Sequence, residues 1–132
     1  RIFYWVNKKN KLSSKSSLSI RDLKAQKLGL PGNSYKITKT ILDACKEAGV
    51  TLRDVYCDTE MYCLYQFVSE NKGISFTTKY HNELDVFGQN NDIVCIPSEE
   101  FTLSVGLARL KSHVLTHDEN LFYEYGISRY LQ

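Results

Sequence analysis

The stretch that most constrains the fold runs from Asp54 to Phe76, DVYCDTEMYCLYQFVSENKGISF. Two β-prone runs, 55–57 and 74–76, enclose a segment whose apolar residues recur at helical spacing: Met61, Leu64, Tyr65 and Val68. Gly73 ends that segment. A strand, a helix and a second strand in this order predict a βαβ unit, with a parallel sheet and a right-handed crossover.

The rest of the chain continues this alternation. A strand at 27–30 and a helix at 35–48 precede the central stretch and form a further βαβ unit with it. The helix predicted in the central stretch spans 60–72. We also expect strands at 2–6, 93–96 and 103–110, an exposed loop at 7–17, a helical turn capped by Ser19, a short helix at 77–84, and a final helix with a Thr116/Glu119 capping box and an apolar face of Leu121, Phe122 and Tyr125. The predicted fold class is α/β, with helices on both faces of a parallel or mixed sheet.

Small ligands bind beyond the carboxyl ends of parallel strands, where helices begin. Ser34, Thr59 and Thr77 stand at three such starts and are the predicted caps. If the helix starts converge, their free N–H groups would bind a small anion or carboxylate. Plain capping explains each of the three residues singly. Asp58 and Glu60 favour a different ligand, because they would discourage a strong anion and could hold an ammonium group.

Composition limits the classes of protein to consider. The chain has 132 residues, of which 42% are hydrophobic and 24% charged, as in an ordinary globular domain. No apolar run approaches the ~18 residues of a membrane span, and no signal peptide is visible. Because the sequence opens at Arg1 rather than Met, we expect it to be part of a longer chain.

The residues that usually carry chemistry form no recognisable constellation. Four cysteines, at 45, 57, 63 and 95, lack C-x-x-C spacing and are expected to be free thiols in the core of a cytoplasmic protein. His113 and His117 are four apart but straddle a predicted junction, so no metal site is expected. Nucleophile-elbow, dinucleotide-binding and P-loop motifs are all absent. The sequence therefore favours a binding protein over an enzyme, with no cofactor.

Charge is distributed unevenly. Residues 1–27 hold eight Lys or Arg against one acid, for a net +7, and the remainder carries −5. Such a basic end could face nucleic acid. Because segment 7–27 lacks the aromatic side chains of a nucleic-acid platform, a solvated loop is the preferred interpretation.

Four segments, in this order, resemble the effector-binding domain of LysR-type bacterial transcription regulators. They are Asn7–Leu23 (NKKNKLSSKSSLSIRDL), Leu28–Ser34, Leu64–Phe76 (LYQFVSENKGISF) and Asp92–Leu110. The resemblance covers nearly the whole chain. It departs from the family at Thr77-Thr78, where an apolar residue and Pro are more usual, and at Lys11-Leu12-Ser13, which replaces Pro-Leu-Ala.

The resemblance implies a type 2 periplasmic-binding-protein-like fold of two subdomains, of which this chain is an incomplete part. Residues 18–92 would be the second subdomain. Residues 1–17 and 93–132 would supply crossing strands and a remnant of the first subdomain with its C-terminal helix. A DNA-binding helix-turn-helix would precede Arg1.

The resemblance also implies a function. A small organic metabolite, such as a carboxylate or an amino acid, would bind between the subdomains, and closure would control a DNA-bound dimer or tetramer in the cytoplasm, with no role for a membrane. The effector-binding positions would be Pro31, Gly32, Asn33, Ser34, Thr59, Glu60 and Phe76. The dimer interface would include Tyr62, Tyr65 and Phe67, unless these rings are core. Because segment 31–36 holds no cysteine, a thiol switch is not expected.

Two alternatives on the same fold class stay open. A solute-binding protein of a transporter would need an upstream signal sequence and usually has disulfides. An enzyme such as a dehydratase or deaminase would need a reactive group at the cleft, with Thr59 or Asp58 as the first candidates.

Overall fold

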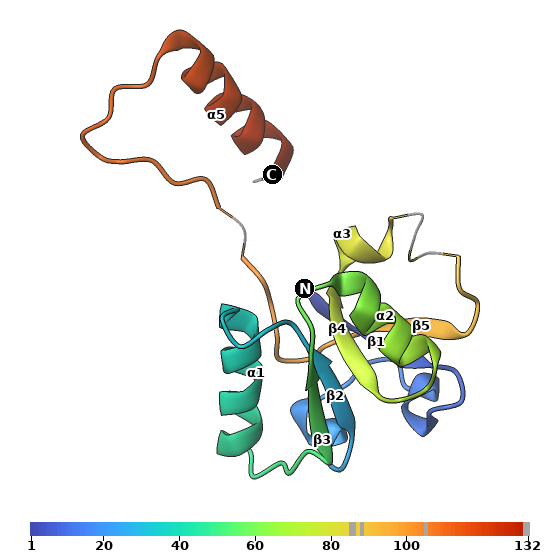
Figure 1. Cartoon of the computed structure of the whole chain (residues 1–132). Coiled ribbons are helices and arrows are strands. Elements are labelled where there is room, and N and C mark those ends of the chain that lie inside the picture. Colours follow the sequence, from blue (N-terminus) through green and yellow to red (C-terminus); the bar gives the residue numbers. More distant parts are fainter. Residues whose placement is uncertain (85–86, 88, 105, 131–132) are drawn as a thin grey trace.

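The computed structural model describes residues 1–84, 87, 89–104 and 106–130, apart from the side chain of Tyr130. The described residues form a five-stranded sheet in the order β3-β2-β4-β1-β5 (Figure 1). The strands are β1 (Ile2–Asn7), β2 (Lys27–Leu30), β3 (Asp54–Cys57), β4 (Ile74–Thr78) and β5 (Ile93–Pro97). β2 pairs in parallel with β3 and β4, whereas β1 pairs antiparallel with β4 and β5. The predicted mixed α/β sheet is confirmed.

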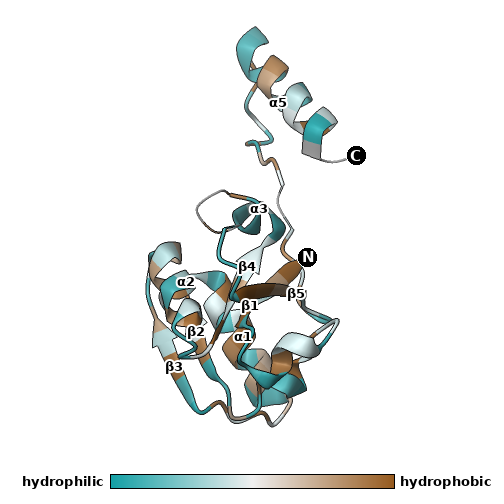
Figure 2. Ribbon diagram, turned by 90° about the vertical axis from the view of Figure 1, so that its right-hand side faces the viewer, coloured by the Kyte–Doolittle hydropathy of each residue, from teal (hydrophilic) through white to brown (hydrophobic). Residues whose placement is uncertain are grey.

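Two helices cover the two faces of this sheet, α1 (Lys36–Glu47) and α2 (Met61–Ser69). Successive side chains of a strand point to opposite faces of the sheet, so each strand contributes side chains to the packing of both helices. Tyr4 belongs to the apolar cluster that contains α1, and its neighbour Trp5 belongs to the cluster that contains α2. Figure 2 shows the hydrophobic residues along β1 and β5 in brown.

The boundaries of α1 and α2 correct two predicted details. Tyr35, not Ser34, is the N-cap of α1, and no side chain caps it. Thr38 instead donates a 2.7 Å hydrogen bond to the Pro31 carbonyl, which ties the first turn to the preceding loop. At the end of α2 the left-handed residue is Asn71, with φ 54°, rather than the predicted glycine. The backbone N–H of Lys72 reaches the Phe67 carbonyl at 3.1 Å, which closes the helix.

The loop predicted at 7–17 is partly structured. It contains a 3₁₀ turn, η1 (Lys11–Ser14), whose Leu12 is buried. A second turn, η2 (Ile20–Leu23), has the capping box expected from Ser19. Most basic residues of the N-terminal stretch are exposed, as a solvated surface requires.

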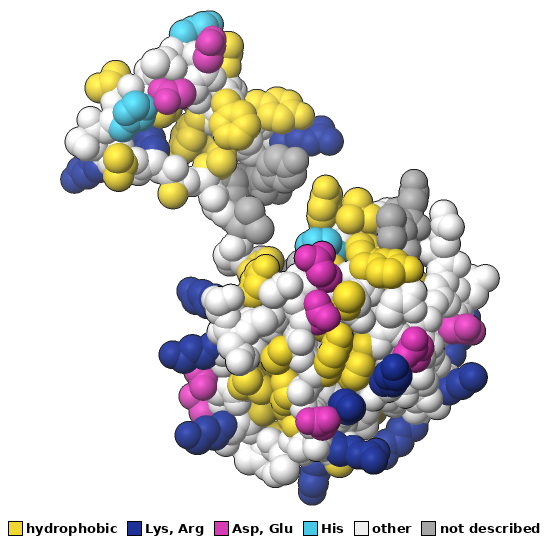
Figure 3. Space-filling model, viewed as in Figure 1, with side chains coloured by type: hydrophobic (Ala, Val, Ile, Leu, Met, Phe, Trp, Pro, Cys, Tyr) yellow, Lys and Arg dark blue, Asp and Glu magenta, His cyan; other side chains and the backbone are white. Residues whose placement is uncertain are grey.

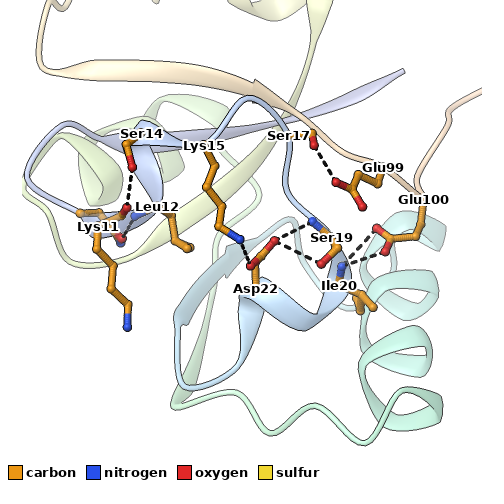
Figure 4. A network of polar contacts seen from close by, with 11 residues as sticks. Lys11, Leu12, Ser14, Lys15, Ser17, Ser19, Ile20, Asp22, Glu99 and Glu100 are labelled. Carbon is orange, nitrogen blue, oxygen red and sulfur yellow. Dashed lines mark hydrogen bonds and ion pairs between the residues drawn. The ribbon is translucent and has the colours of Figure 1, made fainter.

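A polar network joins this region to the segment after β5 (Figure 4). Ser17 donates to the Glu99 carboxylate at 2.6 Å, and the backbone N–H of Ile20 donates to Glu100 at 3.0 Å. Lys15 forms an ion pair with Asp22. Burial raises the pKa of Asp22, but hydrogen bonds from Lys15 and from Ser19 outweigh it and hold that pKa below its usual value. The network therefore fixes the path of the chain as it leaves the sheet.

The C-terminal arm, residues 102–104 and 106–130, departs from the prediction. The strand expected at 103–110 is wrong for the described residues of that range, which are irregular. The predicted capping box is confirmed, since Glu119 accepts from the Thr116 N–H at 2.8 Å and begins α5 (His117–Tyr130). The apolar face of α5 is exposed, with Phe122 at 69% (Figure 3). An alternating segment needs a partner strand to form a sheet, and this sheet offers it none.

The sheet includes both of the strands that were expected to cross between subdomains. β1 and β5, which were assigned to crossing strands and a remnant of another subdomain, are paired with β4 and with each other in the same sheet as β2 and β3. The sheet, α1, α2 and their connections, residues 1–101, are called the body below. The arm stands apart from the body in Figure 1.

Ala25, in the body, has a strained backbone. Ala25 has φ 60° and occupies the third position of a turn closed by the Gln26 N–H and the Leu23 carbonyl at 2.9 Å. This position favours glycine. We expect Ala25→Gly to raise the free energy of unfolding by about 0.5–1 kcal/mol, because the left-handed conformation no longer strains a side chain. Urea unfolding measures this. The control Ala44→Gly, inside α1, should lower the free energy of unfolding. A lower free energy of unfolding for Ala25→Gly would contradict the strain at position 25.

Candidate functional site

A cavity of about 520 Å³ lies at the carboxyl ends of the three parallel strands. Each loop that follows one of these strands contributes to its wall: Pro31 and Tyr35 follow β2, Thr59 follows β3, and His81 follows β4. Parallel strands deliver these loops to one edge of the sheet, which is why residues distant in sequence meet here. A volume of this size is typical of small-molecule sites.

The loops after β2 and β3 are in direct contact. A Cβ atom on Gly32 would lie 3.3 Å from Thr59 Cγ2, so the backbone of one loop packs on the side chain of the other. The Cys57 thiol points at the Asn33 side-chain oxygen at 3.7 Å. These contacts form one side of the cavity rim.

The short helix α3 (Lys79–Asn82) forms the wall after β4. Its N-cap is Thr78, not the predicted Thr77, which is the buried penultimate residue of β4. The Thr78 hydroxyl oxygen accepts from the His81 backbone N–H at 3.3 Å and lies 2.9 Å from His81 Nδ1. On the far side, Trp5 Nε1 donates to Asn82 at 3.0 Å and anchors α3 to the core.

The expected convergence of three capping side chains is not what the structure shows. The N-cap of α2 is Glu60 rather than Thr59, and no side chain caps it. Asp58 is held beside the rim, because it accepts from the Glu60 N–H at 2.9 Å and from the Tyr56 hydroxyl at 2.8 Å. These two hydrogen bonds keep the pKa of Asp58 below its usual value. Asp58 and Glu60 are not among the described residues that line the cavity.

The seven expected effector-binding positions therefore divide into two groups. Pro31, Thr59 and Phe76 line the cavity. The structure places the others outside its walls: Gly32 beside Thr59, and Asn33, Ser34 and Glu60 exposed.

The three aromatic residues expected at an interface divide as well. Tyr62 is 52% exposed. Tyr65 and Phe67 are buried in the α2 cluster, as the core interpretation of these rings requires. The Tyr65 hydroxyl donates to the Phe87 carbonyl at 2.7 Å, and Phe67 stacks on Tyr56 with 5.0 Å between ring centroids.

Most of the other wall residues were missed by sequence reasoning, among them Lys36, His81 and Leu103. His81 was given no role from the sequence. Its position three residues after a strand-ending threonine is the signal that could have placed it at the rim. Leu103 could not be found, because it belongs to the arm and reaches the cavity only through the tertiary fold.

The walls combine an apolar surface with a few polar groups. Ile2, Ile37, Met61 and Phe76 supply apolar side chains from the sheet and both helices. The polar side chains of the wall are Lys36 and His81, together with four that carry hydroxyls: Tyr35, Thr59, Thr77 and Thr78. Such walls fit a small organic molecule that is partly apolar.

Two further features are absent from the described part of the chain. No group of three or more His, Cys, Asp or Glu side chains there could hold a metal ion. None of its helices combines the length and apolarity needed to cross a membrane.

The four cysteines are free. Cys57 is exposed, which corrects its expected place in the core. Burial raises the pKa of the Cys95 thiol to about 11, so this thiol stays protonated at neutral pH.

Comparisons with known proteins show which fold this chain has. No model of a protein family matches the chain, and no curated protein matches it in sequence. Solved structures do match. HinK, a LysR family transcriptional regulator from Pseudomonas aeruginosa, aligns with a TM-score of 0.74 at 21% identity, over 95% of this chain and 43% of HinK. The chain has the fold of a LysR-type effector-binding domain.

Two further structures of this fold contain small molecules. The CcmR regulatory domain of Synechocystis PCC6803, in complex with 2-PG, aligns with a TM-score of 0.72 at 15% identity, over 96% of this chain and 61% of that domain. The effector-binding domain of QuiR, in complex with shikimate, aligns with a TM-score of 0.70 at 16% identity, over 98% of this chain and 62% of that domain. The chain thus spans between about two fifths and three fifths of these structures, and its fold is the type 2 periplasmic-binding-like fold in partial form.

Proposed function

We propose that this chain is the effector-sensing part of a LysR-type transcription regulator. The observation that carries the proposal is the cavity of about 520 Å³ at the carboxyl ends of β2, β3 and β4, in a fold whose solved relatives include complexes with 2-PG and shikimate. A small organic effector would occupy this cavity without being chemically changed. The protein would be cytoplasmic, and DNA would be bound by a helix-turn-helix segment outside this chain.

The arm supports a second subdomain in the whole protein. Leu110 is 76% exposed and Val114 is 86% exposed, which is unusual for apolar side chains in a folded chain. We propose that residues 102–104 and 106–110 of the arm, together with α5, pack in that second subdomain. Residues 1–101 would form the other subdomain, which shifts the division expected from the sequence to the point where the chain leaves the sheet.

The cavity lies at this boundary, and that position suggests a mechanism. Leu103 of the arm lines the cavity, and the adjacent Phe101 is buried against Phe76, with 5.9 Å between ring centroids. An effector that touches both the body and Leu103 would favour a closed arrangement of the two subdomains. The effector would change the free-energy difference between the open and closed states by the difference between its binding free energies for the two states. Closure would then alter a dimer or tetramer on DNA, with exposed Tyr62 as an interface residue.

A pocket-filling substitution tests the proposed site. We expect Thr59→Trp to remove effector binding, because the indole would fill the cavity at its rim. The matched control is Thr51→Trp, since Thr51 is also exposed but lies outside the cavity. A panel of organic acids, amines and amino acids is screened by thermal shift, because a bound ligand raises the unfolding temperature.

A compound that stabilises the parent and Thr51→Trp but not Thr59→Trp supports the site. Equal stabilisation of Thr59→Trp would contradict it. The enzyme alternative has its own test. Turnover of a bound compound that Thr59→Ala or Asp58→Ala abolishes would replace the sensing function with a catalytic one.

A further inference from the structure

The cavity walls carry an unbalanced set of charges. Lys36 and His81 line the cavity, and no Asp or Glu does so among its described lining residues. Lys36 makes no ion pair with any residue that the structure describes, so its ammonium stays available. Two acids flank Thr59 in sequence and neither lines the cavity: Asp58 accepts from the Tyr56 hydroxyl and a backbone N–H, and Glu60 is exposed.

Hydrogen bonding sets the role of His81. The Thr78 hydroxyl oxygen accepts the His81 backbone N–H at 3.3 Å, so its own hydrogen is free to be donated to Nδ1, 2.9 Å away. A neutral imidazole whose Nδ1 accepts must carry its hydrogen on Nε2. In that tautomer, and in the charged form, His81 carries an N–H donor on Nε2.

The hydroxyls do not reverse this imbalance. Thr77 is 3% exposed and donates to the Thr78 carbonyl at 3.3 Å, and the Thr78 hydroxyl is engaged with His81. The wall thus offers the ligand strong donors but no charged acceptor. Tyr35 and Thr59 add two neutral hydroxyls, and the rest of the wall is apolar, including Ile2 and Phe76, which are 2% and 4% exposed.

From these walls we infer that the ligand is an organic anion with an apolar body, and not an amine or a zwitterionic amino acid. The inference rests on the proposed function, because it names the class of molecule that the same cavity takes. An anion satisfies the donors of Lys36 and His81 with charge-assisted hydrogen bonds. An ammonium group would meet like charge and no carboxylate, which costs affinity.

Matched series of compounds test the inference on the 132-residue chain. Each series keeps one apolar body: phenylacetate, phenylacetamide, phenethylamine and phenylalanine form the first, and the four indole analogues form the second. Calorimetry at pH 7 gives the dissociation constants. We expect the carboxylate to bind about tenfold or more tightly than its amide, amine and amino acid, as one charge-assisted hydrogen bond implies.

Four substitutions assign the effect to the wall. Lys36→Met and His81→Phe should each weaken carboxylate binding by about tenfold and leave amide binding nearly unchanged, because only the anion uses their charge or donor. His81→Gln, which keeps an N–H donor, should recover part of that loss. Lys39→Met is the control, since Lys39 is exposed on the same helix and lies outside the cavity. Circular dichroism verifies that each variant is folded.

The outcomes separate this inference from the proposed function. If amides, amines or amino acids bind as tightly as the acids, and Thr59→Trp removes that binding, the anion inference is overturned and the proposed site stands. If no compound of either series binds, both are overturned. A preference for acids that survives Lys36→Met and His81→Phe together also overturns the inference.

Discussion

Gly73→Ala is expected to unfold the body or to cost about 3 kcal/mol or more of its stability, since overpacking against fixed atoms is among the most destabilising of changes. A Cβ atom at this position would overlap the carbonyl oxygen of Lys27 and would lie 2.6 Å from Cε1 and Cζ of the Phe67 ring. The carbonyl belongs to the backbone of β2, so it cannot move aside without breaking the contact between β2 and β4. Gly73 therefore allows β2 and β4 to lie close together in the sheet that carries the cavity, in addition to its position after α2.

Urea unfolding of three glycine variants measures this effect. Gly49→Ala isolates the backbone contribution, because Gly49 has φ 66° and open space around its Cα, and it should cost about 1 kcal/mol. Gly106→Ala, on the arm with no neighbour within 4 Å, should change little. Phe67→Leu added to Gly73→Ala should fail to restore stability, because the clash with the Lys27 carbonyl persists. A Gly73→Ala protein as stable as the parent would contradict the observed approach of β4 to β2.

Asn7→Asp is expected to destabilise the body by about 3 kcal/mol at pH 7, the scale for a buried charge that loses its partners. Asn7 is 2% exposed, and its Nδ2 donates to the carbonyls of Val68 and Ser69 at 3.2 and 2.9 Å. Its Oδ1 accepts from the Lys9 N–H at 2.9 Å. The side chain thus binds the last turn of α2 to the end of β1. A carboxylate would set a negative charge against two carbonyl oxygens.

The pH dependence of this variant distinguishes charge from lost packing. Burial against carbonyl oxygens raises the pKa of the introduced carboxyl above its unfolded value of about 3.9. A raised folded pKa means that the folded state binds the proton more tightly, so the deficit relative to the parent should shrink as pH falls from 7 toward 4. The measurement is the difference in unfolding free energy between variant and parent across that range. Asn91→Asp, at an exposed position, should show neither effect, and a pH-independent deficit at position 7 would exclude the charge explanation.

The alternation of strands and helices was predictable because it depends on local patterns. The runs at 27–30 and 55–57 become β2 and β3, with β3 beginning one residue earlier at Asp54, since Pro and charged residues delimit these short segments. Gly49 ends α1 by its left-handed backbone, with φ 66°. The parallel pairing of β2 with β3 and β4 follows from the helices between them, because parallel strands require a crossover.

The details of the site were less predictable because they depend on single positions and on tertiary contacts. Ser34, Thr59 and Thr77 each stand one residue before the actual N-cap, and a shift of one residue changes which side chain faces the cavity. Helical periodicity identified apolar faces of α2 but could not say which face the sheet would cover, so Tyr65 and Phe67 fell inside and Tyr62 outside. The segment 103–110 has the period of a strand, but a strand forms only where another chain segment pairs with it.

A structure of the chain with the tightest-binding carboxylate of the two series tests the central claim most directly. The account predicts that the ligand lies at the carboxyl ends of β2, β3 and β4, in contact with Thr59, His81 and Phe76, with its carboxylate within hydrogen-bond distance of Lys36 or His81. A ligand bound instead at the amino ends of these strands, beside Arg53 and Lys72, or on the arm alone, would contradict it.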